Sequence, residues 1–315
     1  EAVGHRVVHG GEEFTGSVLI DDAVIASIER MARLAPLHNP PNLTGIRAAR
    51  NALPGVPQVA CFDTAFHTTI PAVAYTYALP YELYEQQGIR RYGFHGTSHR
   101  YVAQRAAGFL HLPHTHFNGI TCHLGNGSSI TAVRDGQSVD TSMGFTPLEG
   151  VAMGTRCGDI DPAILLFLAE EGQDVASLNA MCNKRSGVLG ISGCSNDMRT
   201  LIAKAAEGHC RSQLAIDVFC YRIKKYIGAY SAVLGRVDAI VFTGGIGENA
   251  PLVRSKICTG LELLGMELDP QLNEQADGGE RRIDRTSKTA ILVIPTDEEG
   301  TIADDSYQLL LKRAQ

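Results

Sequence analysis

Short runs of hydrophobic and β-branched residues alternate along the chain with longer stretches in which hydrophobic positions follow the helical period. The short runs predict strands at residues 3–9, 58–62, 119–124, 129–134, 238–242 and 290–294. The longer stretches predict helices at 23–35, 99–108, 162–171, 213–234 and 303–313. Asp135-Gly136 predicts a tight turn that leads into a further strand at 138–141. Strands that alternate with helices in this way are typical of an α/β fold.

The face of the helix at 213–234 is predicted from its hydrophobic spacing. The residues expected to share that face are Leu214, Val218, Tyr221, Ile223, Ile227, Tyr230 and Leu234. The segment 273–288 is polar and charged, and it predicts a surface connection before the last strand.

Composition narrows the class of protein. The chain has 315 residues, 44% of them hydrophobic and 20% charged, which is enough for about two globular domains. Its net charge of −6 argues against a nucleic-acid binder that works through bulk electrostatics. No apolar run approaches the roughly 20 residues of a membrane-spanning helix. The eight cysteines include no Cys-x-x-Cys pair, which favours thiols in a reducing cytoplasm over a zinc site or a disulfide framework.

Candidate substrate-binding residues lie in the first part of the chain. In a strand, Arg6 and Val8 share a face, so the guanidinium can hold a small carboxylate while the valine packs against its alkyl end. The alternative is an edge-strand arginine with a solvated head. His38 lies in a proline-rich segment, 34–42, that predicts a stiff loop, where it is either a positioned donor or an ordinary structural residue. Asp63 ends a buried strand, where it can orient a catalytic residue or a metal-bound water, or can cap a helix.

Two glycine-containing segments are suited to anionic phosphoryl groups. His95 precedes a predicted helix that Thr97 or Ser98 can cap, and an imidazole donor at a helix N-terminus favours an anion. Residues 125–128, Gly-Asn-Gly-Ser, form the tip between two strands, where clustered backbone N–H groups can hold phosphate. A tight turn with a buried histidine and an ordinary β-turn are the corresponding alternatives.

The second half of the chain adds a further arginine and an acidic segment. Arg156 lies among glycines in a long loop, and phosphoryl transfer between two anions needs such local positive charge. A surface arginine in a mobile connection is the alternative. The carboxylates at 297–299 can bind Mg²⁺, or they can stabilise the first turn of the terminal helix.

A third segment suits a nucleotide. Residues 238–249 predict a strand, a glycine loop and a helix that Asn249 can cap, although a purely structural turn has the same pattern. Asp197 and Arg199 can contact a ribose or base, or the aspartate can cap a helix while the arginine lies on the surface.

Seven segments, taken together and in order, resemble the acetate kinase family over the whole chain. They lie at 4–11, 37–41, 62–67, 92–99, 123–129, 153–158 and 243–249, and they include Phe-His-Gly-Thr-Ser-His, His-Leu-Gly-Asn-Gly-Ser-Ser and Thr-Gly-Gly-Ile-Gly-Glu-Asn. The resemblance implies the duplicated α/β fold of the ribonuclease H-like, actin-like ATPases, which is shared with sugar kinases and heat-shock ATPases. It implies a first domain at 1–63 plus 298–315, and a second, nucleotide-binding and dimer-forming domain at 64–297 of a cytoplasmic homodimer.

The resemblance also implies a reaction, the reversible transfer of the ATP γ-phosphoryl group to acetate, which gives acetyl phosphate and ADP with Mg²⁺, or with Mn²⁺ in its place. A carboxylate is already ionised at pH 7, so direct in-line transfer needs no strong base and no phosphoenzyme. By position, Arg6 and Arg156 are similar to the arginine pair that holds acetate and neutralises the phosphoryl oxygens. His95 resembles the transition-state donor, Asp63 the catalytic aspartate and Glu298 the magnesium-binding glutamate.

The remaining matched positions bind the two substrates. His38 is a supporting residue, and the methyl pocket is Val8, Leu37, Phe94 and Pro147. On the nucleotide side the matches are His123, Gly125, Asn126, Gly127, Ser128, Asp197, Met198, Arg199, Gly245, Ile246, Gly247, Glu248 and Asn249.

Two alternatives remain at this level. The first alternative is a kinase of propionate or another short-chain carboxylate, which would need a larger pocket. An alanine at position 8 would make room for the longer acid, whereas Val8 favours acetate. The selectivity that one methylene gives is only about 1–3 kcal/mol, so overlap between the two acids is expected. The family begins with a strand and an Asn-x-Gly-Ser-Ser-Ser type loop, about 85 residues in all, that this sequence lacks. The second alternative is therefore a nucleotide-binding fragment without turnover, which would bind ATP weakly and transfer phosphoryl groups poorly.

Overall fold

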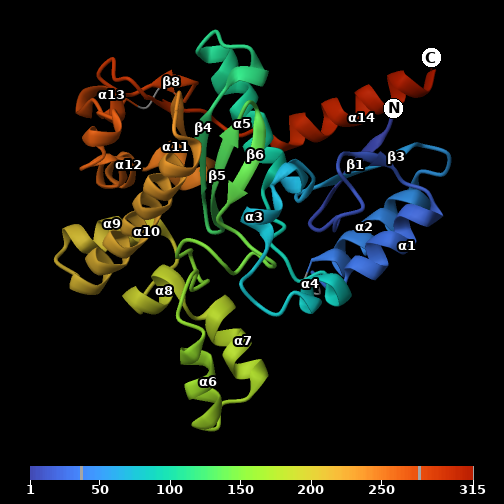
Figure 1. The fold of residues 1–315 in the computed structure, drawn as a ribbon, viewed down its shortest axis with the longest axis horizontal. Helices are drawn as coiled ribbons and strands as arrows, with labels where there is room; N and C mark the ends of the chain where they lie inside the picture. The colour runs from blue at the N-terminus through green and yellow to red at the C-terminus, as the bar shows by residue number, and fades with distance from the viewer. Residues whose placement is uncertain (36–37, 276–277, 315) are drawn as a thin grey trace.

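The computed structural model describes residues 1–35, 38–275 and 278–314, and the strands of these residues form two sheets (Figure 1). The first sheet has the order β1-β3-β2, where β1 is parallel and β2 antiparallel to β3. The second has the order β6-β5-β4-β7-β9-β8, with β4, β7 and β9 parallel. The strands are β1 (Val3–Val7), β2 (Val18–Leu19), β3 (Gln58–Phe62), β4 (Gly119–Leu124), β5 (Ser128–Arg134), β6 (Gln137–Thr141), β7 (Ala239–Thr243), β8 (Arg281–Arg282) and β9 (Ala290–Val293).

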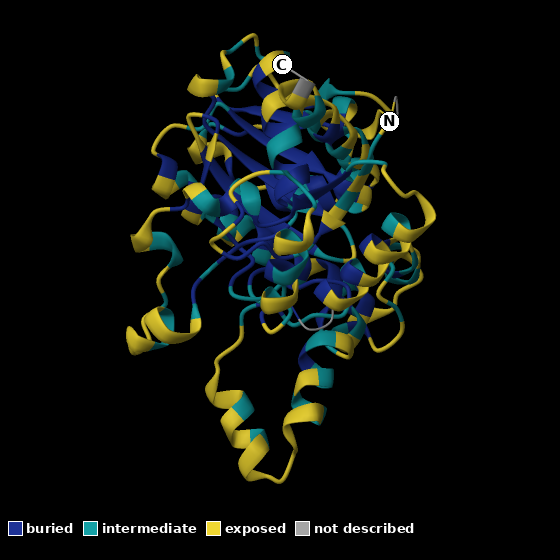
Figure 2. Ribbon diagram, turned by 90° about the vertical axis from the view of Figure 1, so that its right-hand side faces the viewer, coloured by how far each residue is buried: buried dark blue, intermediate teal, exposed yellow. Residues whose placement is uncertain are grey.

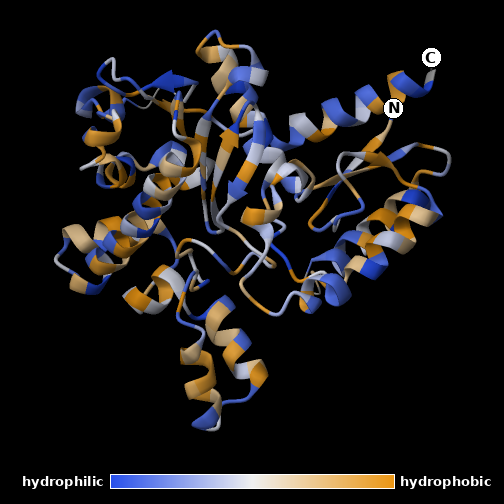
Figure 3. Ribbon diagram, viewed as in Figure 1, coloured by the Kyte–Doolittle hydropathy of each residue, from blue (hydrophilic) through white to orange (hydrophobic). Residues whose placement is uncertain are grey.

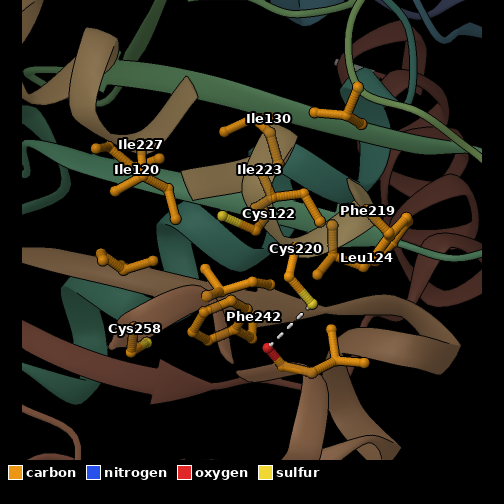
Figure 4. Close-up of a cluster of buried hydrophobic side chains, with 14 of the residues drawn as sticks. Ile120, Cys122, Leu124, Ile130, Phe219, Cys220, Ile223, Ile227, Phe242 and Cys258 are labelled. Carbon is orange, nitrogen blue, oxygen red and sulfur yellow. Dashed lines mark hydrogen bonds between the residues drawn. The ribbon is translucent and has the colours of Figure 1, made fainter. Parts of the chain in front are cut away.

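Helices cover both faces of the second sheet. Along β7, Ile240 and Phe242 pack into the cluster of α10 (Cys210–Leu234), whereas Ala239 and Val241 pack into that of α5 (Gly96–Phe109). Successive side chains of a strand point to opposite faces, so each hydrophobic run serves two cores. Figure 4 shows the larger core, in which side chains of α10 meet those of β4, β5 and β7. The two-sided core holds the strand ends in fixed positions.

The first sheet is also covered on both faces. Ile28 of α1 (Asp22–Met31) and Ile46 of α2 (Asn39–Ala52) pack with Phe62 of β3. On the other face, Gly4 lies so close to Ile302 of α14 (Glu298–Ala314) that a side chain at position 4 would collide with it. Figure 1 shows α14 and the α1–α2 pair on opposite sides of β1 and β3. The assignment of the two predicted domains to particular residues stays a prediction.

The remaining helices connect these layers. Within the described ranges, no helix combines the length and the apolar character that crossing a bilayer requires. The shorter helices are α3 (Ala72–Tyr75), α4 (Glu82–Gln87), α6 (Ala163–Glu170), α7 (Val175–Lys184), α8 (Gly187–Ser192), α9 (Met198–Ala206), α11 (Gly244–Asn249), α12 (Pro251–Cys258) and α13 (Pro270–Glu274), with single 3₁₀ turns at Ala65–Thr69, His114–His116 and Glu262–Leu264.

Three predicted loops or caps are wrong. The described part of the proline-rich segment includes the start of α2, because Pro40 and Pro41 occupy its first turn, where a missing N–H costs no hydrogen bond. The glycines after β7 form the short helix α11, and Asn249 ends it, where its Nδ2 donates to the Gly245 carbonyl oxygen instead of capping a helix. Neither Thr97 nor Ser98 caps α5, which begins earlier, at Gly96.

One surface assignment is also wrong, and one predicted helix face is wrong in part. The segment 273–288 contains β8, which pairs with β9, and a fully buried Ile283, so its described part is more than a connection. In α10, Leu214 and Tyr221 are 54% and 61% exposed. Ile223, Ile227, Tyr230 and Leu234 are buried as predicted, whereas in the first half of the helix the buried face is a neighbouring one that includes Ile216, Phe219 and Cys220.

Candidate active site

A bidentate ion pair lies at the carboxyl ends of β1 and β3. Arg6 Nε donates to Asp63 Oδ1 at 2.9 Å, and Arg6 Nη2 donates to Asp63 Oδ2 at 2.7 Å. Parallel pairing of the two strands brings these residues together across 57 positions of sequence. Asp63 is 1% exposed and Arg6 is 46% exposed, so the buried carboxylate fixes a guanidinium whose outer edge stays open. The hydrogen bond and the charge of Asp63 raise the pKa of Arg6, which keeps the positive charge in place.

His95 adjoins this pair through the start of α5. The Gly96 N–H donates to the Asp63 carbonyl oxygen at 2.9 Å, and that oxygen occupies the space that a side chain at position 96 would need. His95 itself is the N-cap of α5 in the left-handed conformation, with φ 56°, which is rare for a non-glycine residue and is concentrated at functional sites. Its Nδ1 lies 2.9 Å from Ser129 Oγ, and its ring stacks on His123 at 4.3 Å.

The ring of His95 is neutral in this setting. Burial, followed by the charges of His123, His99, Arg6 and Arg156, lowers the pKa of His95 well below its usual value. A neutral imidazole in this place carries one N–H, and Nε2 has no hydrogen-bond partner among the described residues. Nε2 therefore remains available to a ligand.

Arg156 approaches His95 at the tip of the β4–β5 hairpin. A Cβ atom built on Gly127 would lie 3.5 Å from Arg156 Nη1 and 3.5 Å from His95 Nε2, so the two donors and the hairpin meet at one point. Arg156 Nη1 donates to the Pro147 carbonyl oxygen at 3.2 Å. Burial lowers the pKa of Arg156, but a guanidinium remains protonated at neutral pH. The structure thus brings Arg6, His95 and Arg156 into one region, although they lie in separate segments of the sequence.

An apolar cluster lies beside these donors. Phe94, Met143 and Met153 are fully buried together, and Val8 packs against them. The sequence predicted Val8 and Phe94, whereas it missed the two methionines. Of the two, Met153 was the easier to predict, because it lies only three residues before the predicted Arg156. In the structure its Sδ lies 3.7 Å from Arg156 Nη1. Leu37, also predicted here, lies outside the described residues.

His38 is half-buried next to the two arginines. Burial, then the positive charge of Arg156, and to a smaller extent that of Arg6, lower the pKa of His38, while the charge of Asp63 opposes them. A neutral histidine here can donate a hydrogen bond to an anion without adding a third positive charge to the arginine pair.

A cavity of about 570 Å³ is lined in part by Gly125 and Asn126 of the same hairpin. Eight of its lining residues were predicted from the sequence, and Asn196, Ile202 and Ala250 were not. Ile202 follows Met198 by one helical turn on α9, so the helical period could have found it. Asn196 Nδ2 donates to Asn126 Oδ1 at 3.0 Å, a contact across 70 residues that no local pattern indicates. The predicted lining residues are Gly125, Asn126, Asp197, Met198, Arg199, Gly245, Ile246 and Asn249.

Five predicted nucleotide-binding residues do not line this cavity. Gly127 lies at the hairpin tip, against Arg156 and His95. His123 stacks on His95, and Ser128 Oγ closes the hairpin through both the N–H and the carbonyl oxygen of Gly125. Gly247 is buried against the sheet, and Glu248 accepts hydrogen bonds from the N–H groups of Gly244 and Thr296. These residues shape the surrounding loops.

Asp197 and Arg199 line the cavity, and they adopt the structural alternative in which the aspartate caps a helix and the arginine lies on the surface. Asp197 Oδ1 caps α9 by accepting from the Arg199 N–H, and the Arg199 guanidinium folds back onto the same carboxylate. The Arg199 side chain is 91% exposed, so solvent screening leaves this pair little weight in stability.

Comparison with known proteins decides the family. The sequence profile described as the acetokinase family matches residues 1–304. The chain belongs to the acetokinase family. The acetate kinase of Methanosarcina acetivorans is 59% identical over 98% of this chain and 76% of its own. The crystal structure of Porphyromonas gingivalis acetate kinase superposes with a TM-score of 0.95 at 51% identity, over 98% of this chain and 78% of its own.

A second solved structure shows how close the substrate classes lie within this fold. A propionate kinase from Francisella tularensis superposes on this chain with a TM-score of 0.92 at 48% identity, over 96% of this chain and 78% of its own. These matches confirm the predicted α/β fold of the actin-like ATPase type.

Two carboxylates, Asp63 and Glu298, lie beside Arg6, and one of them is open to a divalent cation. Burial, and to a smaller extent the charge of Asp63, raise the pKa of Glu298, whereas Arg6 opposes the rise. Both oxygens of Asp63 accept from Arg6, which leaves Glu298 as the carboxylate open to a cation. No group of three or more His, Cys, Asp or Glu that could hold a metal ion occurs in the part of the chain that the structure describes. The donor set fits Mg²⁺, which binds one or two carboxylates together with water and substrate phosphates.

Proposed function

We propose that the protein transfers the γ-phosphoryl group of ATP reversibly to acetate, which gives acetyl phosphate and ADP. The main support is that Arg156 meets His95 at the hairpin tip, with the charge of Arg6 acting on His95, close to both a cavity of nucleotide size and a small apolar cluster. Membership of the acetokinase family agrees with this reaction.

In the proposed reaction, acetate lies with its carboxylate toward Arg6 and its methyl group toward Val8 and Phe94. One carboxylate oxygen attacks the γ-phosphorus while the bond from that phosphorus to the bridging oxygen of ADP breaks. The acceptor is already ionised, so no general base is needed. Arg156 and the Nε2–H of His95 would stabilise the charge on the transferred group, and the fixed guanidiniums would hold two mutually repelling anions in line.

Mg²⁺ belongs to this proposal as a partner of the nucleotide. Glu298 would hold it with Asp63 close by, and the bound ion would neutralise charge on the phosphate oxygens.

The proposal is tested together with the choice between acetate and propionate. With ATP, Mg²⁺ and hydroxylamine, we expect the full-length protein to form acetyl hydroxamate, and absence of that product would refute the function.

Val8→Ala leaves more space in the apolar cluster, so it should lower the KM for propionate more than the KM for acetate. The ratio of the two KM values should change roughly tenfold. Val18→Ala, at a half-buried valine of the first sheet away from the cluster, is the matched control. Equal effects of Val8→Ala on both acids would remove Val8 from the alkyl site.

We further propose that the protein is a homodimer that pairs through α6 and α7. The residues of α6 are all at least partly exposed, and Leu166 and Phe167 are 66% and 60% exposed. Figure 2 shows these two helices projecting with mostly exposed residues, and Figure 3 shows that many of the residues are hydrophobic. A projecting surface of this kind is typical of a protein–protein contact.

For the dimer, the double variant Leu166→Glu/Phe167→Glu places two like charges in the proposed contact. We expect it to sediment as a monomer at concentrations where the unmodified protein is a dimer. The dissociation constant of the dimer should rise at least tenfold. Leu263→Glu, at a fully exposed leucine elsewhere, should leave the dimer intact. Identical sedimentation of both variants would exclude α6 from the contact.

A further inference from the structure

We propose that Thr121, His99 and Ser129 form a buried hydrogen-bond relay that holds His95 in the tautomer with its proton on Nε2. The assignment of that proton to the transferred phosphoryl group rests on the proposed function. The three relay residues would be positioning residues, because they act on the reaction only through His95.

The relay is continuous and completely buried. Thr121 Oγ1 lies 2.7 Å from His99 Nδ1, His99 Nε2 lies 2.7 Å from Ser129 Oγ, and Ser129 Oγ lies 2.9 Å from His95 Nδ1. Thr121, His99 and Ser129 are each 0% exposed. Thr121 lies on β4, Ser129 on β5 and His99 in the first turn of α5, so the relay is mounted on three packed elements.

The donor in each hydrogen bond of the relay can be assigned by starting from Thr121. Among the described residues, His99 Nδ1 is the hydrogen-bond partner available to the Thr121 hydroxyl. A buried hydroxyl hydrogen without an acceptor is costly, so Thr121 donates to Nδ1. Burial, with smaller contributions from His67 and His123, lowers the pKa of His99 well below its usual value, so the ring is neutral and carries its single proton on Nε2.

The remaining links are then fixed in turn. His99 Nε2–H donates to Ser129 Oγ, and the Ser129 hydroxyl donates its own hydrogen to His95 Nδ1. The neutral His95 ring must therefore carry its proton on Nε2, next to Arg156 and Gly127. The opposite direction would leave the Thr121 hydrogen unpaired, and it would turn a lone pair of His95 toward an anion. Choosing the tautomer of a catalytic histidine through its second nitrogen is a recognised role of such partners.

The first test is spectroscopic and needs no turnover. In ¹⁵N-histidine-labelled full-length protein, the His95 signal is assigned by its loss in His95→Gln, and its long-range ¹H–¹⁵N pattern should show a protonated Nε2 and an unprotonated Nδ1. A protonated Nδ1 in the unmodified protein would overturn the relay. This result is independent of phosphoryl transfer, so loss of the proposed function and loss of the relay are distinguishable.

The second test removes the first donor. Thr121→Val should convert the His95 signal into a mixture of tautomers and lower kcat about tenfold, with the KM values for ATP and acetate nearly unchanged. Thr121→Ser restores the hydroxyl and should restore both readouts. The matched control is Thr131→Val, because Thr131 lies opposite Thr121 on β5 and its hydroxyl bonds to that of Thr141 instead. Equal changes in the His95 signal and in kcat for Thr121→Val and Thr131→Val would show a general packing effect and overturn the proposal.

Discussion

Replacing Arg156 with alanine should reduce kcat for acetyl phosphate formation by roughly 100-fold or more, as the loss of about 3 kcal/mol of charge stabilisation requires. Arg156 Nη1 lies at the hairpin tip with His95 Nε2, where the transferred group is proposed to pass. The remaining cation, Arg6, is held by Asp63 and cannot move to replace it. The KM values should change less than kcat, because the lost contact strengthens as charge develops on the equatorial oxygens.

Two controls separate charge from packing in this experiment. Added guanidinium ion should partly restore the turnover of Arg156→Ala if the missing group is the cation itself. Arg47→Ala removes an exposed arginine that pairs with Glu29 on α1, and it should leave kcat unchanged. An Arg156→Ala variant with near-normal kcat would take Arg156 out of the proposed mechanism.

The longer strands were predicted well because their signal is local, whereas the two-residue strands β2 and β8 were not predicted. Runs such as 58–62 and 119–124 are buried on both faces of a sheet, so they appear in the sequence as continuous hydrophobic segments. The helix α10 shows the limit of such signals. Leu214 and Tyr221 fit a helical period, but only the neighbouring sheet determines which of two adjacent faces is buried.

The candidate site was predictable where its chemistry follows from a short motif. Most of the lining of the 570 Å³ cavity was predicted from the resemblance of glycine-containing segments and of residues 197–199 to the acetate kinase family, because each segment alone left a structural alternative open. The contacts that connect these segments were not predictable in this way. Arg6 meets Asp63 through the pairing of β1 with β3, and Asn196 meets Asn126 through the packing of α9 beside the hairpin. No local pattern connected Thr121 with His99, since only the packing of α5 on the sheet joins their hydrogen bonds into a chain.

The second large effect is expected from Gly96→Ala, which adds one methyl group at the start of α5. A Cβ atom at position 96 would collide with the backbone carbonyl oxygen of Asp63, a residue whose own N–H donates to the Val7 carbonyl oxygen at the end of β1. The collision would also break the hydrogen bond from the Gly96 N–H to the Asp63 carbonyl oxygen. We expect kcat to fall by about 100-fold or more, because His95 would shift relative to the Arg6–Asp63 pair. Misplacement of reacting groups by about an ångström has this effect on rate.

Gly108→Ala is the matched control for that variant, because it makes the same change near the end of the same helix, where no atom lies within 4 Å of the added methyl group. Alanine is the better helix former by up to about 1 kcal/mol, so Gly108→Ala should raise the thermal unfolding midpoint and leave kcat unchanged. Gly96→Ala should lower the midpoint, since strain of this kind costs roughly 1–3 kcal/mol. If kcat for Gly96→Ala matched that for Gly108→Ala, the close approach of α5 to Asp63 would not be what aligns the catalytic groups.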